Sequence, residues 1–130
     1  LLAMTQALHR AEVEAKDVDY INLHGTASQA NDRIEAHALG QLFPDSTLAS
    51  STKGWTGHTL GAAGILEAII TLEAMRHGEV PGTLNCDEPE EDFAFRVTRE
   101  NVQKPIRYAM TNSFGFGGNN ATLAFGAAHD

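Results

Sequence analysis

The chain has 130 residues, of which 42% are hydrophobic and 20% charged, a balance typical of one soluble domain with a single core. Its net charge is −8 and its nine Lys and Arg residues are scattered, so nucleic acid and anionic lipid are disfavoured as partners. No apolar run reaches the roughly 20 residues that span a bilayer, and no signal-type segment opens the chain, so we expect no membrane contact and a cytoplasmic location.

The first third of the chain alternates helix and strand. Residues 1–11 have amphipathic helical spacing, and the pattern begins so abruptly at Leu1 that we expect a longer protein. Residues 20–23 have the character of a short buried strand, which a polar turn follows. A helix is predicted over 32–42, with Asp32 as its cap. The residues that recur there at helical spacing are Ile34, His37, Ala38 and Leu42.

A second strand and a long helix occupy the middle of the chain. Residues 44–46 end the preceding helix, and residues 48–51 are predicted to form a short buried strand. A glycine-rich stretch covers 54–64 and leads into a helix over 61–76. Small residues at the start of that helix allow close backbone approach, and the apolar residues that follow predict that the helix is buried.

The last part of the chain is predicted to be dominated by strands. An acidic, turn-rich loop covers 81–92, and the alternation in 93–97 suits a strand. Residues 108–112 and 121–125 are predicted to form a closing strand pair around the glycine-rich segment 113–120. Helices that alternate with strands, followed by strands alone, predict one α/β domain over 1–130, with packed helices on a mixed sheet.

Three polar segments each follow a predicted strand. They read HGTAS over 24–28, STKGWTGHTLGAAG over 51–64 and NSFGFGGNN over 112–120. Loops that leave the strand ends of an open α/β sheet carry chemistry on a rigid scaffold, so the three segments are candidates for one site.

Two histidines and a lysine are the candidate reactive groups of these segments. Taken alone, His24 or His58 is more often a hydrogen-bonded structural histidine than a catalyst. Two histidines on separate glycine-flanked loops, with Lys53 nearby in the sequence, could instead supply convergent donors that stabilise a developing oxyanion or enolate.

The glycines of segment 113–118 permit either a hairpin or an exposed backbone N–H for an oxyanion hole. Dinucleotide binding does not fit the context, because no helix follows Gly118 and the chain runs directly into the apolar residues 121–125.

In this order, the three segments resemble the C-terminal half of the β-ketoacyl-ACP synthases, condensing enzymes of the thiolase-like superfamily. The resemblance covers nearly the whole chain and implies a thiolase-like C-terminal half as the fold. The family pattern has one histidine in an HGT loop, a lysine and a second histidine in an STK…GHxxGAAG loop, and a closing NSFGFGG loop.

The resemblance implies a role for each matched residue. His24 and His58 would hydrogen-bond the malonyl thioester carbonyl and stabilise the enolate that forms when carbon dioxide leaves. Lys53 would organise the site, and Glu67 matches the glutamate that pairs with this lysine, although an ordinary helix-surface glutamate is the alternative.

Further matched residues flank this centre. Phe116 resembles a gatekeeping phenylalanine whose backbone N–H contributes to the oxyanion hole, and the alternative is an exposed hairpin aromatic. Thr26 and Ser28 resemble hydroxyls that contact the pantetheine arm, and the alternative is ordinary turn residues.

The chain also departs from the family pattern. Residues 27–29 replace a more common small-Thr-Pro run, the pair Gly54-Trp55 is unusual between lysine and histidine, and Asn119 stands where threonine is frequent. Trp55 is bulky enough to reshape a pocket or a partner surface, so no acyl-chain preference carries over.

The family's cysteine nucleophile has no match in these 130 residues. The single cysteine, Cys86, excludes an internal disulfide and lies in an acidic turn, surroundings that disfavour a reactive thiolate. We expect Cys86 to be a bystander and the nucleophile to belong to the N-terminal half of the fold.

By resemblance, then, the expected activity is acyl transfer: decarboxylative Claisen condensation of an acyl-enzyme with malonyl-ACP in fatty-acid or polyketide synthesis. The chain alone is expected to be inactive. No metal or organic cofactor is expected beyond the phosphopantetheine arm of acyl-carrier protein. The implied partners are that carrier, the N-terminal half and a second copy in a homodimer. The alternative is a non-catalytic partner of the chain-length-factor type, which retention of His24, Lys53 and His58 disfavours, and a degradative thiolase fits less well.

Overall fold

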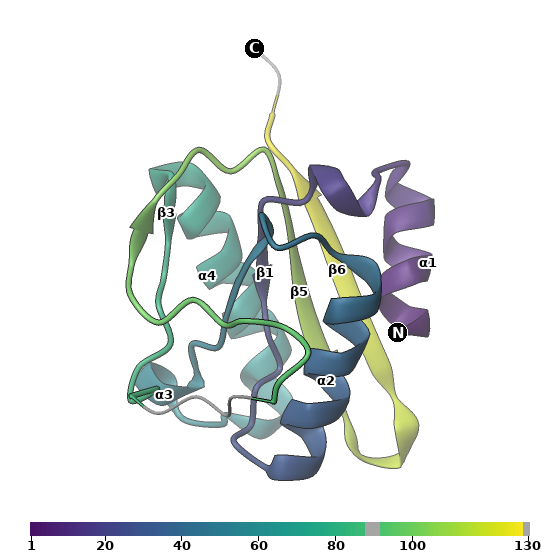
Figure 1. The fold of residues 1–130 in the computed structure, drawn as a ribbon, viewed down its shortest axis with the longest axis vertical. Helices are drawn as coiled ribbons and strands as arrows, with labels where there is room; N and C mark the ends of the chain where they lie inside the picture. The colour runs from purple at the N-terminus through teal and green to yellow at the C-terminus, as the bar shows by residue number, and fades with distance from the viewer. Residues whose placement is uncertain (88–91, 129–130) are drawn as a thin grey trace.

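The computed structural model describes residues 1–87 and 92–128 and has a four-stranded mixed sheet at its centre (Figure 1). The strand order is β2-β1-β5-β6, in which β2, β1 and β5 are parallel and β6 is antiparallel to β5. A separate two-stranded antiparallel sheet pairs β3 with β4. The strands are β1 (Tyr20–Asn22), β2 (Leu48–Ser50), β3 (Glu79–Val80), β4 (Val102–Gln103), β5 (Tyr108–Phe114) and β6 (Asn120–Gly126).

Helices cover both faces of this sheet. In Figure 1, α1 and α2 lie on one face and α4 lies on the other, so the domain has three layers. The α/β class and the mixed sheet predicted from the sequence are confirmed. The helices are α1 (Leu2–Ala11), α2 (Gln29–Leu42), the short α3 (Lys53–Thr56) and α4 (Ala63–His77), with 3-10 turns η1 (Ala15–Asp17), η2 (Leu60–Ala62) and η3 (Phe116–Gly118).

The period-two alternation of β1 divides the core between the two helical layers. Ile21 and Leu23 belong to the hydrophobic cluster of α1 and α2, whereas Tyr20 belongs to the cluster that includes Ala74 of α4. All four side chains are almost fully buried. β1 is thus covered on both faces, as expected for a central parallel strand.

The helix predicted over 32–42 exists, but its cap and buried face differ from the prediction. The cap is Ser28, whose Oγ accepts a hydrogen bond from the backbone N–H of Asn31, so α2 begins at Gln29 and Asp32 lies in its first turn. The predicted face is wrong in part, because Ile34 is 71% exposed and His37 is also exposed. The helix buries Glu35, Ala36, Ala38 and Leu39 instead.

The predicted helix over 61–76 corresponds to α4, and the prediction that it is buried holds for one face only. That face holds small and polar residues, including Glu67 and Thr71. The opposite face is apolar and exposed, and its residues recur at helical spacing. They are Ile65, Ile69 and Leu72, which are 66%, 52% and 46% exposed.

The strand predicted over 93–97 is wrong. Phe95 is buried and Phe93 packs against the same core, so the apolar alternation is real, but the segment forms no strand ladder. The chain makes isolated backbone bonds instead, such as that from Thr98 N to Ala49 O at 2.7 Å. Of the predicted loop 81–92, the structure describes residues 81–87 and 92, and residues 88–91 lie outside the described part of the chain.

The predicted closing strand pair is confirmed and is longer than expected. The antiparallel ladder of β5 and β6 begins where Tyr108 pairs with Gly126 and ends where Phe114 pairs with Asn120. Short strands β3 and β4 were not predicted, because two residues carry no readable period. Among the described residues, no helix is long and apolar enough to cross a membrane.

Candidate active site

The three polar segments singled out in the sequence meet at one edge of the sheet. Strands β1, β2 and β5 are parallel, so their carboxyl ends lie at the same edge. His24 follows β1, Lys53 begins α3 shortly after β2, and Phe114 ends β5. The topology therefore brings together side chains that lie up to 90 positions apart in the sequence.

A buried carboxylate holds the loop that carries His24. Glu35 on α2 is 3% exposed and accepts hydrogen bonds from the backbone N–H groups of His24 and Gly25, at 2.8 and 2.9 Å. Asn112 of β5 donates to the same carboxylate at 3.2 Å. Burial raises the pKa of Glu35, and these three donors oppose that rise. The carboxylate fixes the backbone of the His24 loop to both α2 and β5.

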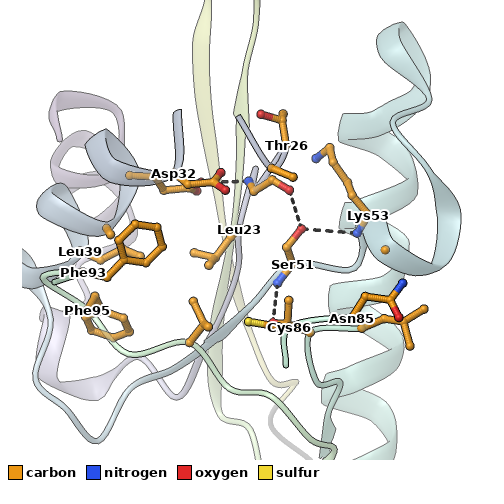
Figure 2. A pocket seen from close by; sticks show the side chains of 18 of the residues that line it. Leu23, Thr26, Asp32, Leu39, Ser51, Lys53, Asn85, Cys86, Phe93 and Phe95 are labelled. Carbon is orange, nitrogen blue, oxygen red and sulfur yellow. Dashed lines mark hydrogen bonds between the residues drawn. The ribbon is translucent and has the colours of Figure 1, made fainter. Parts of the chain in front are cut away.

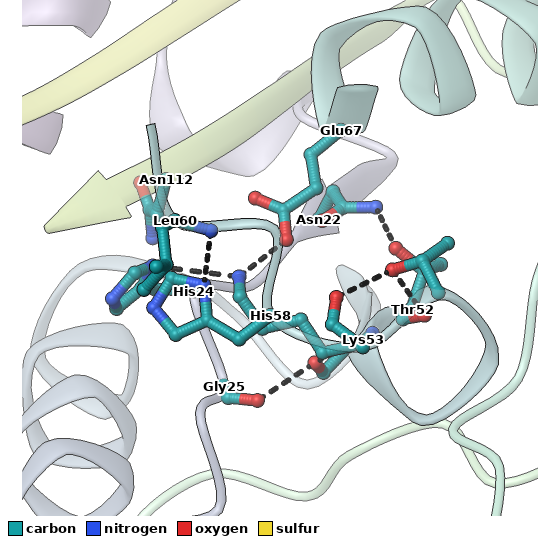
Figure 3. Close-up of polar contacts among 12 residues, drawn as sticks. Asn22, His24, Gly25, Thr52, Lys53, His58, Leu60, Glu67 and Asn112 are labelled. Carbon is teal, nitrogen blue, oxygen red and sulfur yellow. Dashed lines mark hydrogen bonds and ion pairs between the residues drawn. The ribbon is translucent and has the colours of Figure 1, made fainter. Parts of the chain in front are cut away.

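A buried ion pair joins the loop after β2 to α4. The ammonium group of Lys53 contacts Oε1 of Glu67, and the two residues are 8% and 1% exposed (Figure 3). Burial raises the pKa of Glu67, and the hydrogen bond and charge of Lys53 oppose that rise. The pairing predicted for Glu67 is present, and the alternative of an ordinary helix-surface glutamate is wrong.

Burial and the neighbouring lysine together set the protonation state of the first histidine. Lys53 Nζ lies 3.5 Å from His24 Nδ1, and burial, the charge of Lys53 and His58 lower the pKa of His24 to about 4. The ring is therefore neutral at pH 7. Because the ammonium group can only donate, Nδ1 is the acceptor and Nε2 carries the proton.

His58 has the same arrangement of donor and acceptor. The backbone N–H of Leu60 donates to His58 Nδ1 at 3.2 Å, so Nδ1 is the acceptor and Nε2 is the nitrogen that can donate. The rings of His24 and His58 are perpendicular, with centroids 5.7 Å apart. The two imidazoles, each with Nδ1 facing a protein donor, thus lie next to each other at this edge of the sheet.

A cavity of about 610 Å³ opens beside these rings, and we call it the histidine cavity. Thr26 and Ser28 line it, and the hydroxyl of Thr26 donates to that of Ser28 at 3.3 Å; their contact with a substrate arm stays a prediction. Phe114 also lines it and packs edge-on against His24, with ring centroids 5.5 Å apart. The side chain of Phe116, the predicted gatekeeping phenylalanine, lies outside the described part of the chain.

A second cavity of about 520 Å³ is lined by Lys53, Ser51 and Leu23 (Figure 2), and it shares Thr26 and His58 with the histidine cavity. Phe93 and Phe95 form part of its wall, and Cys86 lies at its edge. Cys86 is not among the residues that line the histidine cavity, and its interpretation as a bystander stays a prediction. Among the described residues, no group of three or more His, Cys, Asp or Glu side chains is placed to hold a metal.

The sequence did not identify two of the polar groups that build this site. Glu35 was missed because its helix was assigned an apolar face centred elsewhere. Asn112 was quoted within a motif, but its contact with Glu35 joins residues 77 positions apart. An ionisable residue inside the small-residue stripe of an amphipathic helix is the signal that could have revealed Glu35.

Residues 1–87 match the family described as the β-ketoacyl synthase C-terminal domain. The chain is 46% identical, over 96% of its length, to a mitochondrial 3-oxoacyl-[acyl-carrier-protein] synthase of Arabidopsis thaliana. It is 44% identical, over 95% of its length, to 3-oxoacyl-[acyl-carrier-protein] synthase 2 of Vibrio cholerae serotype O1. The chain covers 29% and 31% of these two relatives, or about a third of their length.

Solved structures agree with this assignment. The fold superposes on the ishigamide ketosynthase/chain length factor with a TM-score of 0.92 and 34% identity, over 97% of this chain and 32% of that one. It superposes on a β-ketoacyl synthase from Burkholderia phymatum with a TM-score of 0.88 and 35% identity, over 98% of this chain and 33% of that one. The resemblance stated from the three motifs is therefore confirmed, and the chain belongs to the β-ketoacyl synthase family, of which it carries the C-terminal domain.

Proposed function

We propose that this chain supplies the decarboxylation half of a condensing site that joins an acyl-enzyme to malonyl-ACP in fatty-acid or polyketide synthesis. The observation that carries the proposal is the pair of imidazoles of His24 and His58, which line one cavity and whose Nδ1 atoms both face protein donors, so that Nε2 is the nitrogen left to donate. The names of the relatives support the reaction class, since they are 3-oxoacyl-[acyl-carrier-protein] synthases.

In this mechanism, the two Nε2–H groups donate to the thioester carbonyl oxygen of the malonyl group. The bond between the methylene carbon and the carboxylate breaks, carbon dioxide leaves, and the electron pair forms an enolate whose charge lies on that oxygen. Donors placed in advance stabilise such charge without reorganising, and each contributes about 3 kcal/mol in comparable sites. The enolate carbon then attacks the acyl thioester, and the cysteine thiolate departs.

Neutral histidines suit this step better than charged ones. A cationic imidazole would pair with the malonyl carboxylate and hold it in the ground state, whereas a neutral donor favours the carbonyl oxygen as its charge grows. Burial, with the charge of Lys53 as a second cause, lowers the pKa of His24 and keeps it neutral, and Lys53 is itself held by Glu67. This pairing gives both residues an indirect role in the reaction.

The nucleophilic cysteine is proposed to come from outside these 130 residues. Cys86, the single cysteine of the chain, lines the other cavity. The exposed apolar face of α4 is proposed to pack against the remaining part of the enzyme. Burying the exposed half to two-thirds of Ile65, Ile69 and Leu72 there would contribute roughly 1–2 kcal/mol for each side chain.

The remaining parts of the proposal concern partners and location. The substrate is proposed to arrive on the phosphopantetheine arm of acyl-carrier protein, with no other cofactor, in a homodimeric cytoplasmic enzyme. Relatives solved with a carrier protein or a chain length factor show that similar folds take such partners. Because this chain carries a charge of −8, we propose that the acidic carrier docks mainly on surface supplied by the rest of the enzyme.

A chimera tests the proposal. Residues 1–130 replace the matched third of the Vibrio cholerae synthase, which supplies the remaining sequence. We expect the chimera to condense acyl-ACP with malonyl-ACP, and the isolated chain to be inactive. A folded chimera that forms the acyl-enzyme but releases no carbon dioxide from malonyl-ACP would support the chain-length-factor alternative. Cysteine-dependent condensation by the isolated chain would contradict the division of labour.

A further inference from the structure

The backbone of the His24 loop leaves the sheet abruptly after β1. The last ladder bond between β1 and β2 runs from Leu23 N to Ser50 O at 2.8 Å. Beyond it, Gly25 adopts φ +40°, a backbone conformation that residues other than glycine rarely adopt. Its N–H donates to Glu35, and its carbonyl oxygen accepts from the hydroxyl of Ser51 at 2.9 Å. Ser51 therefore replaces the next ladder bond with a side-chain bond.

The contact between Gly25 and Ser51 is also steric. A Cβ atom at Gly25 would lie 2.5 Å from Ser51 Cβ and 2.6 Å from Ser51 Oγ, closer than such atoms approach in proteins. Ser51 is 8% exposed, so its hydroxyl is shielded from water that could replace the bond. The two loops touch at this point, and glycine is the residue that permits it.

Ser51 also makes hydrogen bonds with the loop that carries the lysine. The backbone N–H of Lys53 donates to Ser51 Oγ at 3.4 Å, and the backbone N–H of Ser51 donates to Thr83 Oγ1 at 3.4 Å. Thr83 donates in turn to Thr98 O at 2.8 Å. One hydroxyl thus lies between the backbone of the histidine loop and the backbone of the lysine loop (Figure 2).

We infer that Ser51 is a positioning residue, whose hydroxyl sets the separation of His24 and Lys53 by clamping Gly25 of one loop to the other. Its catalytic consequence rests on the function proposed above. The geometric consequence does not, because the separation of His24 Nδ1 from Lys53 Nζ is a property of the chain itself. A residue with a purely structural role would change stability and leave that separation unaltered.

The first test measures the titration of His24 by NMR in the 130-residue chain and in Ser51→Ala. Loss of the clamp lets His24 move away from the lysine charge and toward water, so its pKa rises from about 4 by about one unit toward 6.5. The matched control is Thr47→Val. Thr47 is 3% exposed and its hydroxyl donates to Val18 O at 3.0 Å, which clamps the opposite ends of the same two strands. The control is expected to leave the His24 titration unchanged.

The second test uses the chimera and separates the positioning role from a general loss of stability. Ser51→Ala is expected to lower kcat for malonyl decarboxylation about 10-fold with little change in KM, because a small displacement of a donor affects the transition state most. Ser51→Cys keeps the shape of the side chain but makes a weaker hydrogen bond, so its kcat is expected to lie between those of the wild type and Ser51→Ala. This variant replaces Ser51→Ala in the test if the alanine variant does not fold. Wild-type titration of His24 in folded Ser51→Ala overturns the inference, whatever the chimera shows.

Discussion

The two faces of α4 are the reverse of an ordinary surface helix. The face against the sheet buries Glu67 and Thr71, which are 1% and 0% exposed, whereas Ile65, Ile69 and Leu72 face outward. A helix that served only to cover the sheet would turn its apolar stripe inward. On one side α4 contributes Glu67 to the polar site, and its exposed apolar side is the face that we proposed to pack against the remaining part of the enzyme.

The buried ion pair is the largest expected contribution on the polar face. Glu67→Ala leaves the ammonium group of Lys53 buried beside a neutral methyl, and we expect a loss of about 3–5 kcal/mol in the free energy of unfolding. Glu73 provides the control, because its contacts with Arg76 and His77 are exposed and its removal costs at most about 1 kcal/mol. Equal effects of the two substitutions in urea unfolding would show that the polar face adds no special stability.

Burial of His24 predicts a pH dependence with a definite sign. Its folded pKa, about 4, lies below the 6.5 of an unperturbed histidine, so the unfolded chain takes up the proton first as the pH falls. Stability is thus fully present above pH 6.5 and is lost progressively toward pH 4, by about 3 kcal/mol at most.

Glu35 and Glu67 act in the opposite direction, because their raised pKa values favour proton uptake by the folded chain. The comparison that isolates the histidine is therefore wild type against His24→Gln. Their free energies of unfolding should converge as the pH falls from 6.5 to 4. Parallel curves over that range would mean that His24 is not held neutral.

The apolar face of α4 is expected to show the smallest effect on the chain alone. Ile69 is 52% exposed, so Ile69→Lys should change the free energy of unfolding by no more than about 0.5 kcal/mol. In the chimera, the same charge would be buried against the remaining two-thirds, and soluble assembled enzyme should be lost. Ile34→Lys on α2, where Ile34 is 71% exposed, is the matched control and should leave assembly intact.

The sequence predicted the parts of the fold that depend on local patterns. The three longer helices α1, α2 and α4, the short strands β1 and β2 and the closing pair β5–β6 follow from hydrophobic period and glycine placement, and the three motifs identified the family, whereas the short α3 was not predicted. What it could not predict were positions decided by tertiary contacts. Asp32 was predicted to cap the helix because it precedes an apolar run, but the helix begins earlier, where the Ser28 hydroxyl accepts a hydrogen bond from Asn31 N. The segment 93–97 has strand-like alternation, but no neighbouring strand pairs with it.

The same distinction applies to the site. His24, His58 and Lys53 stand in readable motifs, and the predicted pairing of Lys53 with Glu67 is present in the structure. Glu35 and Ser51 were not predicted, because their importance lies in bonds to the backbone of a distant loop. Backbone acceptors and donors carry no sequence signal, so positioning residues are harder to predict than the groups they position.

The most direct test of the proposed function separates the two half-reactions in the chimera. His24→Ala and His58→Ala are each introduced, mass spectrometry follows acyl transfer to the cysteine, and carbon dioxide release follows decarboxylation of malonyl-ACP. We expect each variant to form the acyl-enzyme at close to the normal rate and to lose decarboxylation by about 100-fold or more, because each removes a donor to the enolate oxygen. Normal decarboxylation with loss of acyl-enzyme formation would contradict the assignment of both histidines.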